Sequence, residues 1–305
     1  MLKFWKKNGC ESVLFGIESG SPTMLKVMEK KISLEKNIEA LKYTYEAKLT
    51  TVTQFVIGMP GETDQTIEET IDFMLKTMKY YPDPFRNKIT YLASINYAQS
   101  LPGTPLYEYA REHGFVGRTI DEEEKYLIDI SDKDAYDNDH FLNFTQQPLL
   151  KVLSWRYKIN WKVWRKHAEV NLKIKLSKTK IFLGLLAMFF NKIFKIKINS
   201  ILEKELNKFQ SSKEQKSLVC IARNTAIISD GVRLLIPWNK ITYPLLVLLI
   251  AIKESKNLKW FFKLIIEHII WSLKKFDKSK LPTTTLRKVV NILDKDDTLE
   301  IRKGR

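Results

Sequence analysis

Two stretches, Val13-Leu-Phe-Gly-Ile-Glu-Ser-Gly-Ser21 and Phe55-Val-Ile-Gly-Met-Pro-Gly-Glu-Thr63, decide the fold class of this 305-residue chain. Each is an apolar run that ends in glycine and polar residues, and each precedes a segment whose apolar residues recur at helical spacing. This order predicts buried parallel strands that are each followed by a helix. In such α/β proteins the ligand site forms at the carboxyl ends of the strands, where these glycine and polar residues stand.

A third unit of the same kind follows. Residues 89–97 predict a strand, and Pro102-Gly-Thr-Pro105 predicts a turn into a helix over residues 106–112. Three β-turn-α units in succession predict a parallel sheet with right-handed crossovers, and three units are too few to close a barrel. The predicted helix caps are Ser21, Ser33 and either Thr63 or Asp64.

The charge of the chain is divided unevenly between its two halves. Residues 1–150 hold 17 Lys and Arg against 23 Asp and Glu, a net charge of −6. Residues 151–305 hold 34 against 12, a net charge of +22. This contrast predicts two modules with different partners, and the basic module suits anionic lipid or nucleic acid, or simply a solvated lysine-rich surface.

Cysteine usage and apolar runs favour a cytoplasmic protein, with peripheral membrane contact as an alternative. Two cysteines, Cys10 and Cys220, argue against a disulfide scaffold and fit a reducing compartment. The first residues lack the apolar core of a signal peptide. The apolar runs Ile181–Phe190 and Ile241–Ile252 are shorter than the roughly 20 residues that span a bilayer.

The rest of the chain predicts a linker and a mainly helical domain. Acidic residues between Asp121 and Asp139 indicate an exposed connection, with metal binding as the minor alternative. The run Trp155–Val163 fits either a strand or a helix, whereas Leu258–Lys275 fits an apolar helix that packs in protein or lies on a membrane. We therefore expect an α/β part over residues 1–118, an acidic linker over 119–148 and a basic, mainly helical domain over 149–305.

The first 115 or so residues resemble the later half of a radical S-adenosylmethionine (SAM) enzyme core, in the group that also has a B12-binding domain. The matching motifs are Gly16-Ile-Glu-Ser-Gly-Ser21, Met28-Glu-Lys-Lys31, Gly58-Met-Pro-Gly-Glu-Thr63 and Pro102-Gly-Thr-Pro-Leu-Tyr107. Each motif is weak alone, and their order and spacing make the combination specific. The resemblance implies the last three β-α units of a partial (β/α) barrel with SAM across the carboxyl ends of its strands.

The resemblance also assigns roles to particular residues. Glu18 and Ser19, with Ser21 beside them, would face the ribose and methionine parts of SAM, since ribose hydroxyls donate hydrogen bonds to oxygen acceptors. Phe55, Ile57 and Gly58 would flank the adenine, and Ala93 and Ile95 would border the same pocket. For the serines the alternative is helix capping, and for Phe55 and Ile57 it is ordinary strand core.

One requirement of the family is missing from these 305 residues. The family holds a 4Fe-4S cluster with a CxxxCxxC motif, and the cluster reduces SAM to a 5′-deoxyadenosyl radical. Cys10 and Cys220 cannot build this motif, because such a cluster is held by closely spaced thiolates. We expect this chain to be inactive alone and to be a truncated product, one chain of a split enzyme or a remnant.

Three functional hypotheses stay open on the sequence. The leading one is a radical SAM fragment that supplies part of the SAM pocket for methylation or rearrangement of a small-molecule or lipid-like substrate, with cobalamin as a further cofactor of the family. The second is a split enzyme, in which a separate chain carries the cluster half. The third is a non-catalytic module that binds an anionic membrane or RNA through Trp155, Trp161, Trp164 and their basic neighbours.

Overall fold

The computed structural model describes residues 1–81, 93–117, 119–131, 135, 141–171, 243–255 and 257–273. The chain divides into two compact units, and each is described by itself. The sheet unit comprises residues 1–73 and 93–147, and the helical unit comprises residues 74–92 and 148–273. The predictions for Ile181–Phe190 and Cys220 lie outside the described residues.

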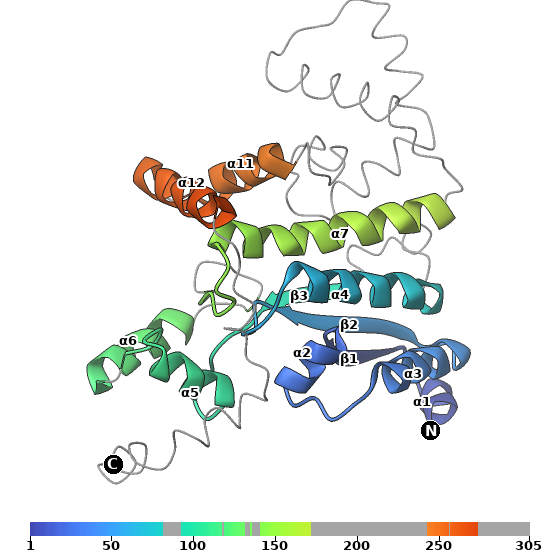
Figure 1. The fold of residues 1–305 in the computed structure, drawn as a ribbon. Helices are drawn as coiled ribbons and strands as arrows, with labels where there is room; N and C mark the ends of the chain where they lie inside the picture. Colours follow the sequence, from blue (N-terminus) through green and yellow to red (C-terminus); the bar gives the residue numbers. More distant parts are fainter. Residues whose placement is uncertain are drawn as a thin grey trace, which may run out of the picture. The chain divides into compact units, whose positions relative to one another are not determined.

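The sheet unit alternates strands and helices in the predicted order. Its elements, drawn in Figure 1, are α1 (Leu2–Lys7), β1 (Ser12–Glu18), α2 (Pro22–Val27), α3 (Leu34–Glu46), β2 (Thr50–Ile57), α4 (Asp64–Thr77), β3 (Ala93–Tyr97), α5 (Pro105–Glu112) and α6 (Ile120–Ser131). Helix α4 continues past the division between the units and is followed by a short 3-10 helix, Met78–Tyr80.

The three strands form one parallel sheet in the order β1-β2-β3. Phe55 pairs with Ile95, and Ile57 pairs with Tyr97. The predicted α/β fold with a parallel sheet is confirmed, while closure into a partial barrel stays a prediction. β2 is the central strand, so the loops that follow β1 and β3 lie on either side of the loop that follows β2.

Side-chain caps start α3, α4 and α5; those at Ser33 and Thr63 were predicted from the sequence, and the one at Thr104 was not. The Ser33 hydroxyl accepts a hydrogen bond from the Lys36 backbone N–H, Thr63 accepts one from Thr66, and Thr104 accepts one from Tyr107. These bonds satisfy backbone donors that a helix start leaves without partners. Ser21 occupies the corresponding position before α2 but makes no side-chain cap, because its hydroxyl is directed to another element.

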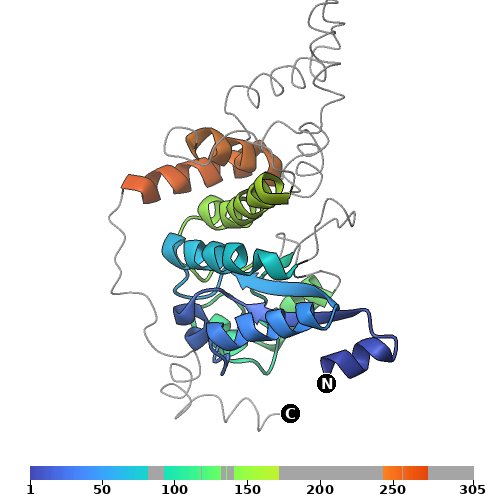
Figure 2. The same ribbon diagram turned by 90° about the vertical axis from the view of Figure 1, so that its right-hand side faces the viewer.

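The two faces of the sheet differ in burial. On one face Thr51, Thr53, Phe55 and Ile57 of β2 are buried, and Phe55 packs edge-to-face on Phe73 of α4 at 6.2 Å between ring centroids. α3 and α4 run alongside the sheet (Figures 1 and 2). The opposite face carries half-buried Val52, Gln54 and Val56, and the side chain of Leu14 on β1 is 58% exposed there. This face is the less covered one among the described residues.

The helical unit contains α7 (Leu149–Asn171), α11 (Tyr243–Glu254) and α12 (Leu258–Leu273). The stretch Trp155–Val163, which fits strand or helix on the sequence, is helical. Trp155, Tyr157 and Ile159 are buried, and the Tyr157 hydroxyl donates a 2.7 Å hydrogen bond to Glu254 of α11. Among the described residues, no helix is both long and apolar enough to cross a bilayer.

The acidic segment is more structured than the expected connection. Residues Ile120–Ser131 form α6, whose residues are half-buried or exposed. The Tyr126 hydroxyl contacts Ser100, and the Tyr107 hydroxyl donates to Glu123, so the acidic helix is anchored to the sheet unit by two tyrosines. The boundaries of the predicted linker, residues 119–148, stay a prediction.

Candidate functional site

The last residue of β1, Glu18, has an unusual backbone conformation. Its φ is +66°, in the left-handed region that a residue with a side chain seldom adopts. The pairing of β1 with β2 shifts register between Gly16 and Glu18, so the strand is irregular at this point. Such a conformation costs about 1–3 kcal/mol and tends to occur where a side chain has to be aimed for function.

The carboxylate of Glu18 is held in place by two features. Lys30 Nζ donates a 2.8 Å hydrogen bond to Glu18 Oε1, and the Glu18 side chain stays 24% exposed. A Cβ added at Gly16 would lie 2.6 Å from the same oxygen. Glycine at position 16 therefore leaves the space in which the carboxylate lies, and the ion pair fixes its direction.

Ser19 and Ser21 are buried and bonded to α4. The Ser19 hydroxyl lies 3.2 Å from the Thr70 hydroxyl and accepts a 3.1 Å hydrogen bond from the Ser21 backbone N–H. The Ser21 hydroxyl donates to Glu69. A Cβ at Gly20 would lie 2.6 Å from the Thr70 Cα and the Phe73 Cβ, so the loop lies directly on α4. These serines fasten the loop after β1 to that helix.

The turn after β2 is organised by Glu62. Glu62 Oε2 accepts hydrogen bonds from the Gly58 N–H at 2.5 Å and from the Met59 N–H at 3.3 Å. The Gln147 side-chain amide donates a 2.6 Å bond to the Glu62 backbone oxygen. The carboxylate is fully buried, and its Oε1 has no hydrogen-bond partner among the described residues. Burial raises the pKa of Glu62 to about 8, against the lowering effect of the Gly58 and Met59 N–H groups.

Gly58 has no room for a side chain. Its φ is +90°, and a Cβ there would lie 2.4 Å from the ring of Phe141. That ring also packs on Tyr97 of β3 at 4.7 Å between centroids. The remaining residues proposed from the sequence differ in access: Phe55, Ile57 and Ile95 are buried, whereas Ala93 is half-buried.

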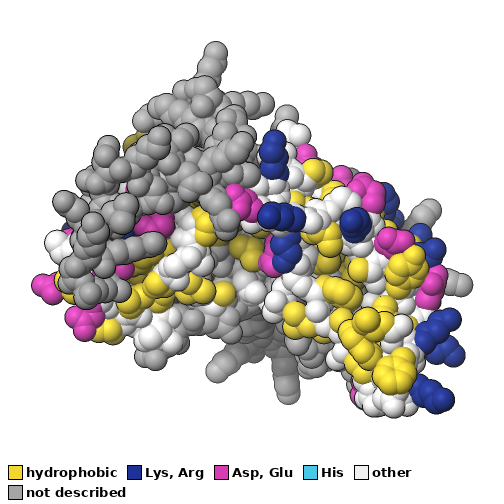
Figure 3. Space-filling model, turned by 90° about the horizontal axis from the view of Figure 1, so that it is seen from below, with side chains coloured by type: hydrophobic (Ala, Val, Ile, Leu, Met, Phe, Trp, Pro, Cys, Tyr) yellow, Lys and Arg dark blue, Asp and Glu magenta, His cyan; other side chains and the backbone are white. Residues whose placement is uncertain are grey.

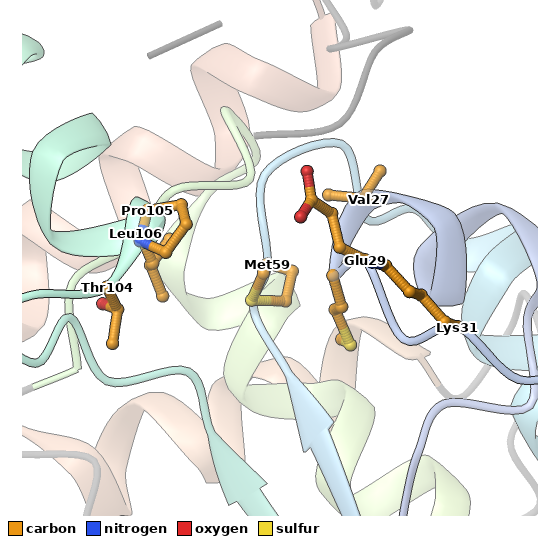
Figure 4. A pocket seen from close by; sticks show the side chains of 8 residues that line it. Val27, Glu29, Lys31, Met59, Thr104, Pro105 and Leu106 are labelled. Atoms are coloured by element: carbon orange, nitrogen blue, oxygen red, sulfur yellow. The ribbon is translucent and has the colours of Figure 1, made fainter. Parts of the chain in front are cut away.

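A cavity of about 340 Å³ opens beside the turn after β2. Figure 4 shows Met59 between two groups of lining residues, with Val27 and Glu29 on one side and Thr104 and Leu106 on the other. The lining thus comes from the segments that follow all three strands, which places the cavity at their carboxyl ends. Its walls are apolar at Val27, Met59 and Leu106, and polar groups enter from Glu29 and Thr104.

The comparison with known families identifies the N-terminal part of the chain. Residues 1–74, which hold β1, β2 and the first part of α4, match the radical SAM superfamily. The resemblance inferred from the Gly16–Ser21 and Gly58–Thr63 motifs is thereby confirmed for this segment.

Proteins similar to this segment are named for several different activities. An uncharacterised methyltransferase of Pyrococcus horikoshii is 38% identical over 108 residues, which are 35% of this chain and 21% of that protein. An anaerobic magnesium-protoporphyrin IX monomethyl ester cyclase of Cereibacter sphaeroides is 30% identical over 112 residues, 37% of this chain and 16% of that protein. A tRNA-2-methylthio-N(6)-dimethylallyladenosine synthase of Koribacter versatilis is 28% identical over 96 residues, 28% of this chain and 22% of that protein. The chain thus spans only about a fifth of the length of these relatives.

Sequence reasoning assigned no role to Glu62 or Lys30, although both hold parts of the candidate site in place. Glu62 was quoted within a motif, but nothing in the spacing shows that its carboxylate turns back onto the Gly58 and Met59 N–H groups. One local signal for this arrangement does exist. Glu62 stands four residues after Gly58 at a strand end, where its carboxylate can accept hydrogen bonds from the backbone of the same turn. Lys30 carries no local signal, because its pairing with Glu18 depends on how α2 returns toward the strand end.

No cluster of three or more His, Cys, Asp or Glu side chains suited to a metal ion is found within the part of the chain that the structure describes. Cys10 is half-buried and precedes β1.

Proposed function

We propose that the sheet unit supplies part of the SAM pocket of a radical SAM enzyme. The observation that carries this proposal is the cavity at the carboxyl ends of the parallel strands, which is lined by residues that follow each of the three strands. Glu18, on its left-handed backbone, ends β1 but is not among the residues that line this cavity. The match of residues 1–74 to the superfamily supports the same assignment.

The residues present fit part of SAM. Glu18 offers a partly exposed carboxylate as an acceptor for the ribose hydroxyls. In the cavity, the apolar side chains of Val27, Met59 and Leu106 suit the thioether side of the methionine part. The backbone at Ala93 would border the adenine, whereas the Phe141 ring lies against Gly58. Bound to a reduced 4Fe-4S cluster, SAM supplies a carbon radical that abstracts hydrogen from the substrate.

The other proposed site residues act by positioning. Because the Ser19 and Ser21 hydroxyls are buried and bonded to α4, they orient the loop that follows Glu18 and do not reach a ligand directly. Phe55, Ile57 and Ile95 are buried core residues that hold β2 and β3 in register. In this proposal Glu18 is the side chain that touches SAM, and Lys30 holds Glu18 in the required rotamer.

The cluster is proposed to come from residues other than these 305, since two cysteines cannot hold it. The outer edge of β1 is the proposed contact for that part, because β1 pairs only with β2 among the described residues and Leu14 is exposed beside it. Figure 3 shows further exposed apolar side chains, edged by lysines, toward the end where α1 lies. A separate cluster-bearing chain should therefore co-purify with this one, and Leu14→Lys should weaken the complex.

The reaction class proposed is radical chemistry at a carbon atom, with methylation favoured over rearrangement because a methyltransferase is among the relatives. Cobalamin, where the reaction uses it, would bind outside these residues. A second relative acts on a magnesium-porphyrin ester, which supports a bulky small-molecule or lipid-like substrate.

The SAM assignment is tested by one pair of variants on the full chain. Equilibrium dialysis with labelled SAM should give saturable binding that Glu18→Gln weakens at least about fivefold, the value expected for losing a hydrogen bond to a charged acceptor. Lys30→Gln is the comparison variant: it breaks the same ion pair but leaves the carboxylate, so it should weaken SAM binding less than Glu18→Gln does. If the two variants bind SAM equally, Glu18 has only a structural role and the proposed contact is wrong.

A further inference from the structure

Helix α12 is apolar on the face that packs in the helical unit and apolar again on the opposite face. Leu264 is buried on the inner face, where Trp271 lies under Lys151 of α7 and His268 lies beside Tyr243 of α11. Figures 1 and 2 show α11 and α12 side by side. The contacts with α7 and α11 therefore account for one face of the helix only.

The opposite face, which we call the outer face of α12, consists of exposed large apolar side chains. At 3.6 residues per turn they fall within an arc of about 120° on the helix. They are Leu258, Phe262, Ile266, Ile269, Ile270 and Leu273. α11 adds a second exposed stripe in the same unit, made of Leu245, Leu248 and Ile252. Contiguous exposed apolar surface of this kind marks an interaction site rather than ordinary solvent-facing residues.

The charges next to this face indicate which partner it meets. Lys259, Lys263 and Glu267 follow one another at i, i+4 and i+8 along one edge of the outer face, and both lysines are exposed. Helix α7 of the same unit carries six Lys and Arg residues against one Glu. An apolar face edged by lysines, on a module with excess positive charge, matches a helix that lies in the plane of an anionic bilayer surface.

We propose that the outer face of α12 docks the helical unit on an anionic lipid surface. Its Leu and Ile side chains would enter the acyl boundary, while Lys259 and Lys263 reach the headgroups along its edge. A helix of 16 residues is too short to span the bilayer, so it lies parallel to the surface. RNA is the less suitable partner, because the face offers Phe262 as its one aromatic ring for base stacking and is otherwise aliphatic.

The test is co-sedimentation of the full 305-residue protein with vesicles of phosphatidylcholine, with and without phosphatidylglycerol. We expect binding to the anionic vesicles that falls as salt is raised, and much weaker binding to the neutral ones. The double variant Ile266→Gln, Ile269→Gln should weaken partition by about tenfold or more, since each buried aliphatic side chain contributes strongly to insertion. Lys259→Gln and Lys263→Gln should each weaken it about fivefold at low salt.

The matched control is Ile120→Gln, Ile128→Gln on α6. It makes the same two changes at isoleucines that are 69% and 63% exposed, against 54% and 52% at Ile266 and Ile269. Circular dichroism verifies that both double variants remain helical. As a second readout, an environment-sensitive dye on Ile266→Cys, in a chain with Cys10→Ser and Cys220→Ser, should shift to the blue on anionic vesicles.

Four results would overturn the proposal. The first is absence of vesicle binding, and the second is equal loss in the α6 and α12 double variants. The third is a dimer, seen by light scattering, that Ile266→Gln, Ile269→Gln dissociates without any vesicle binding, because a second copy would then cover the face. An RNA gel shift that requires Ile266 and Ile269 in the absence of lipid binding would exclude lipid in the same way.

Discussion

Replacing Glu62 tests how the turn after β2 is held. Glu62→Ala removes the acceptor of the Gly58 and Met59 N–H groups, both of which belong to buried residues. Glu62→Gln keeps an oxygen acceptor of nearly the same shape and removes the ionisable group. The two variants therefore separate the contribution of the hydrogen bonds from that of the carboxyl proton.

The magnitudes follow from burial. A buried donor left without an acceptor costs about 1–3 kcal/mol, so the loss of the acceptor for two donors in Glu62→Ala should lower the free energy of unfolding by about 2–6 kcal/mol. Protonation of Glu62 makes a separate contribution to the free energy of unfolding, because burial raises the Glu62 pKa from 4.5 to about 8. A raised carboxyl pKa means that the folded state binds the proton more tightly. The resulting stability is present below pH 4.5 and is lost as the pH rises toward 8.

The assay is urea unfolding followed by circular dichroism at several pH values for wild type, Glu62→Gln and Gln147→Ala. Between the unfolded and folded pKa values, wild-type stability should fall relative to Glu62→Gln by up to about 1.4 kcal/mol per pH unit. Gln147→Ala is the control, since Gln147 donates to the Glu62 backbone oxygen and leaves the carboxyl in place. Its pH slope should equal that of wild type.

A wild-type slope equal to that of Glu62→Gln would refute the reasoning, because Glu62 would then titrate alike in the folded and unfolded states. A loss below 1 kcal/mol in Glu62→Ala would show that water replaces the carboxylate at the Gly58 and Met59 N–H groups.

Three further predictions concern the loops and the cluster. Gly20→Ala should destabilise by about 1–3 kcal/mol in thermal unfolding, because its Cβ would lie 2.6 Å from Thr70 and Phe73; an unchanged transition would mean that the loop lifts off α4 freely. Thr104→Ala should cost about 1 kcal/mol through loss of the α5 cap, with Thr104→Ser restoring most of it. The protein reconstituted anaerobically with iron and sulfide should lack the visible absorbance of a 4Fe-4S cluster; a stoichiometric cluster would show that the cysteine argument is wrong.

The sequence predicts the sheet unit well because its signals are local. Apolar runs that end in glycine at Gly16 and Gly58 predict the strands, and Ser33 and Thr63 start helices where a polar cap precedes a periodic apolar stripe. The parallel pairing of the strands was predicted from the repeated units, whereas the strand order β1-β2-β3 required the structure.

What the sequence missed depends on contacts between distant residues. The pairing of Lys30 with Glu18 and the burial of Ser19 against Thr70 arise from the way loops return to the sheet, which residue spacing does not encode. The sequence left open whether Trp155–Val163 forms a strand or a helix. The stretch lies in α7, and α7 contacts both α11 and α12, so its apolar residues are not confined to one helix face and the helical spacing is less clear. The sequence predicted that α12 is an apolar helix, but only the structure shows that its outer face is exposed.

The central claim, that the carboxyl ends of the three strands cradle SAM, is tested most directly by methyl NMR on the methionine-labelled protein. Titration with SAM should shift the methyl resonances of Met28 and Met59, which line the cavity, and leave that of Met78 beyond α4 unchanged. Glu18→Gln should raise the SAM concentration at which these shifts saturate. Shifts at Met78 alone, or none at Met28 and Met59 while SAM is bound, would contradict the account.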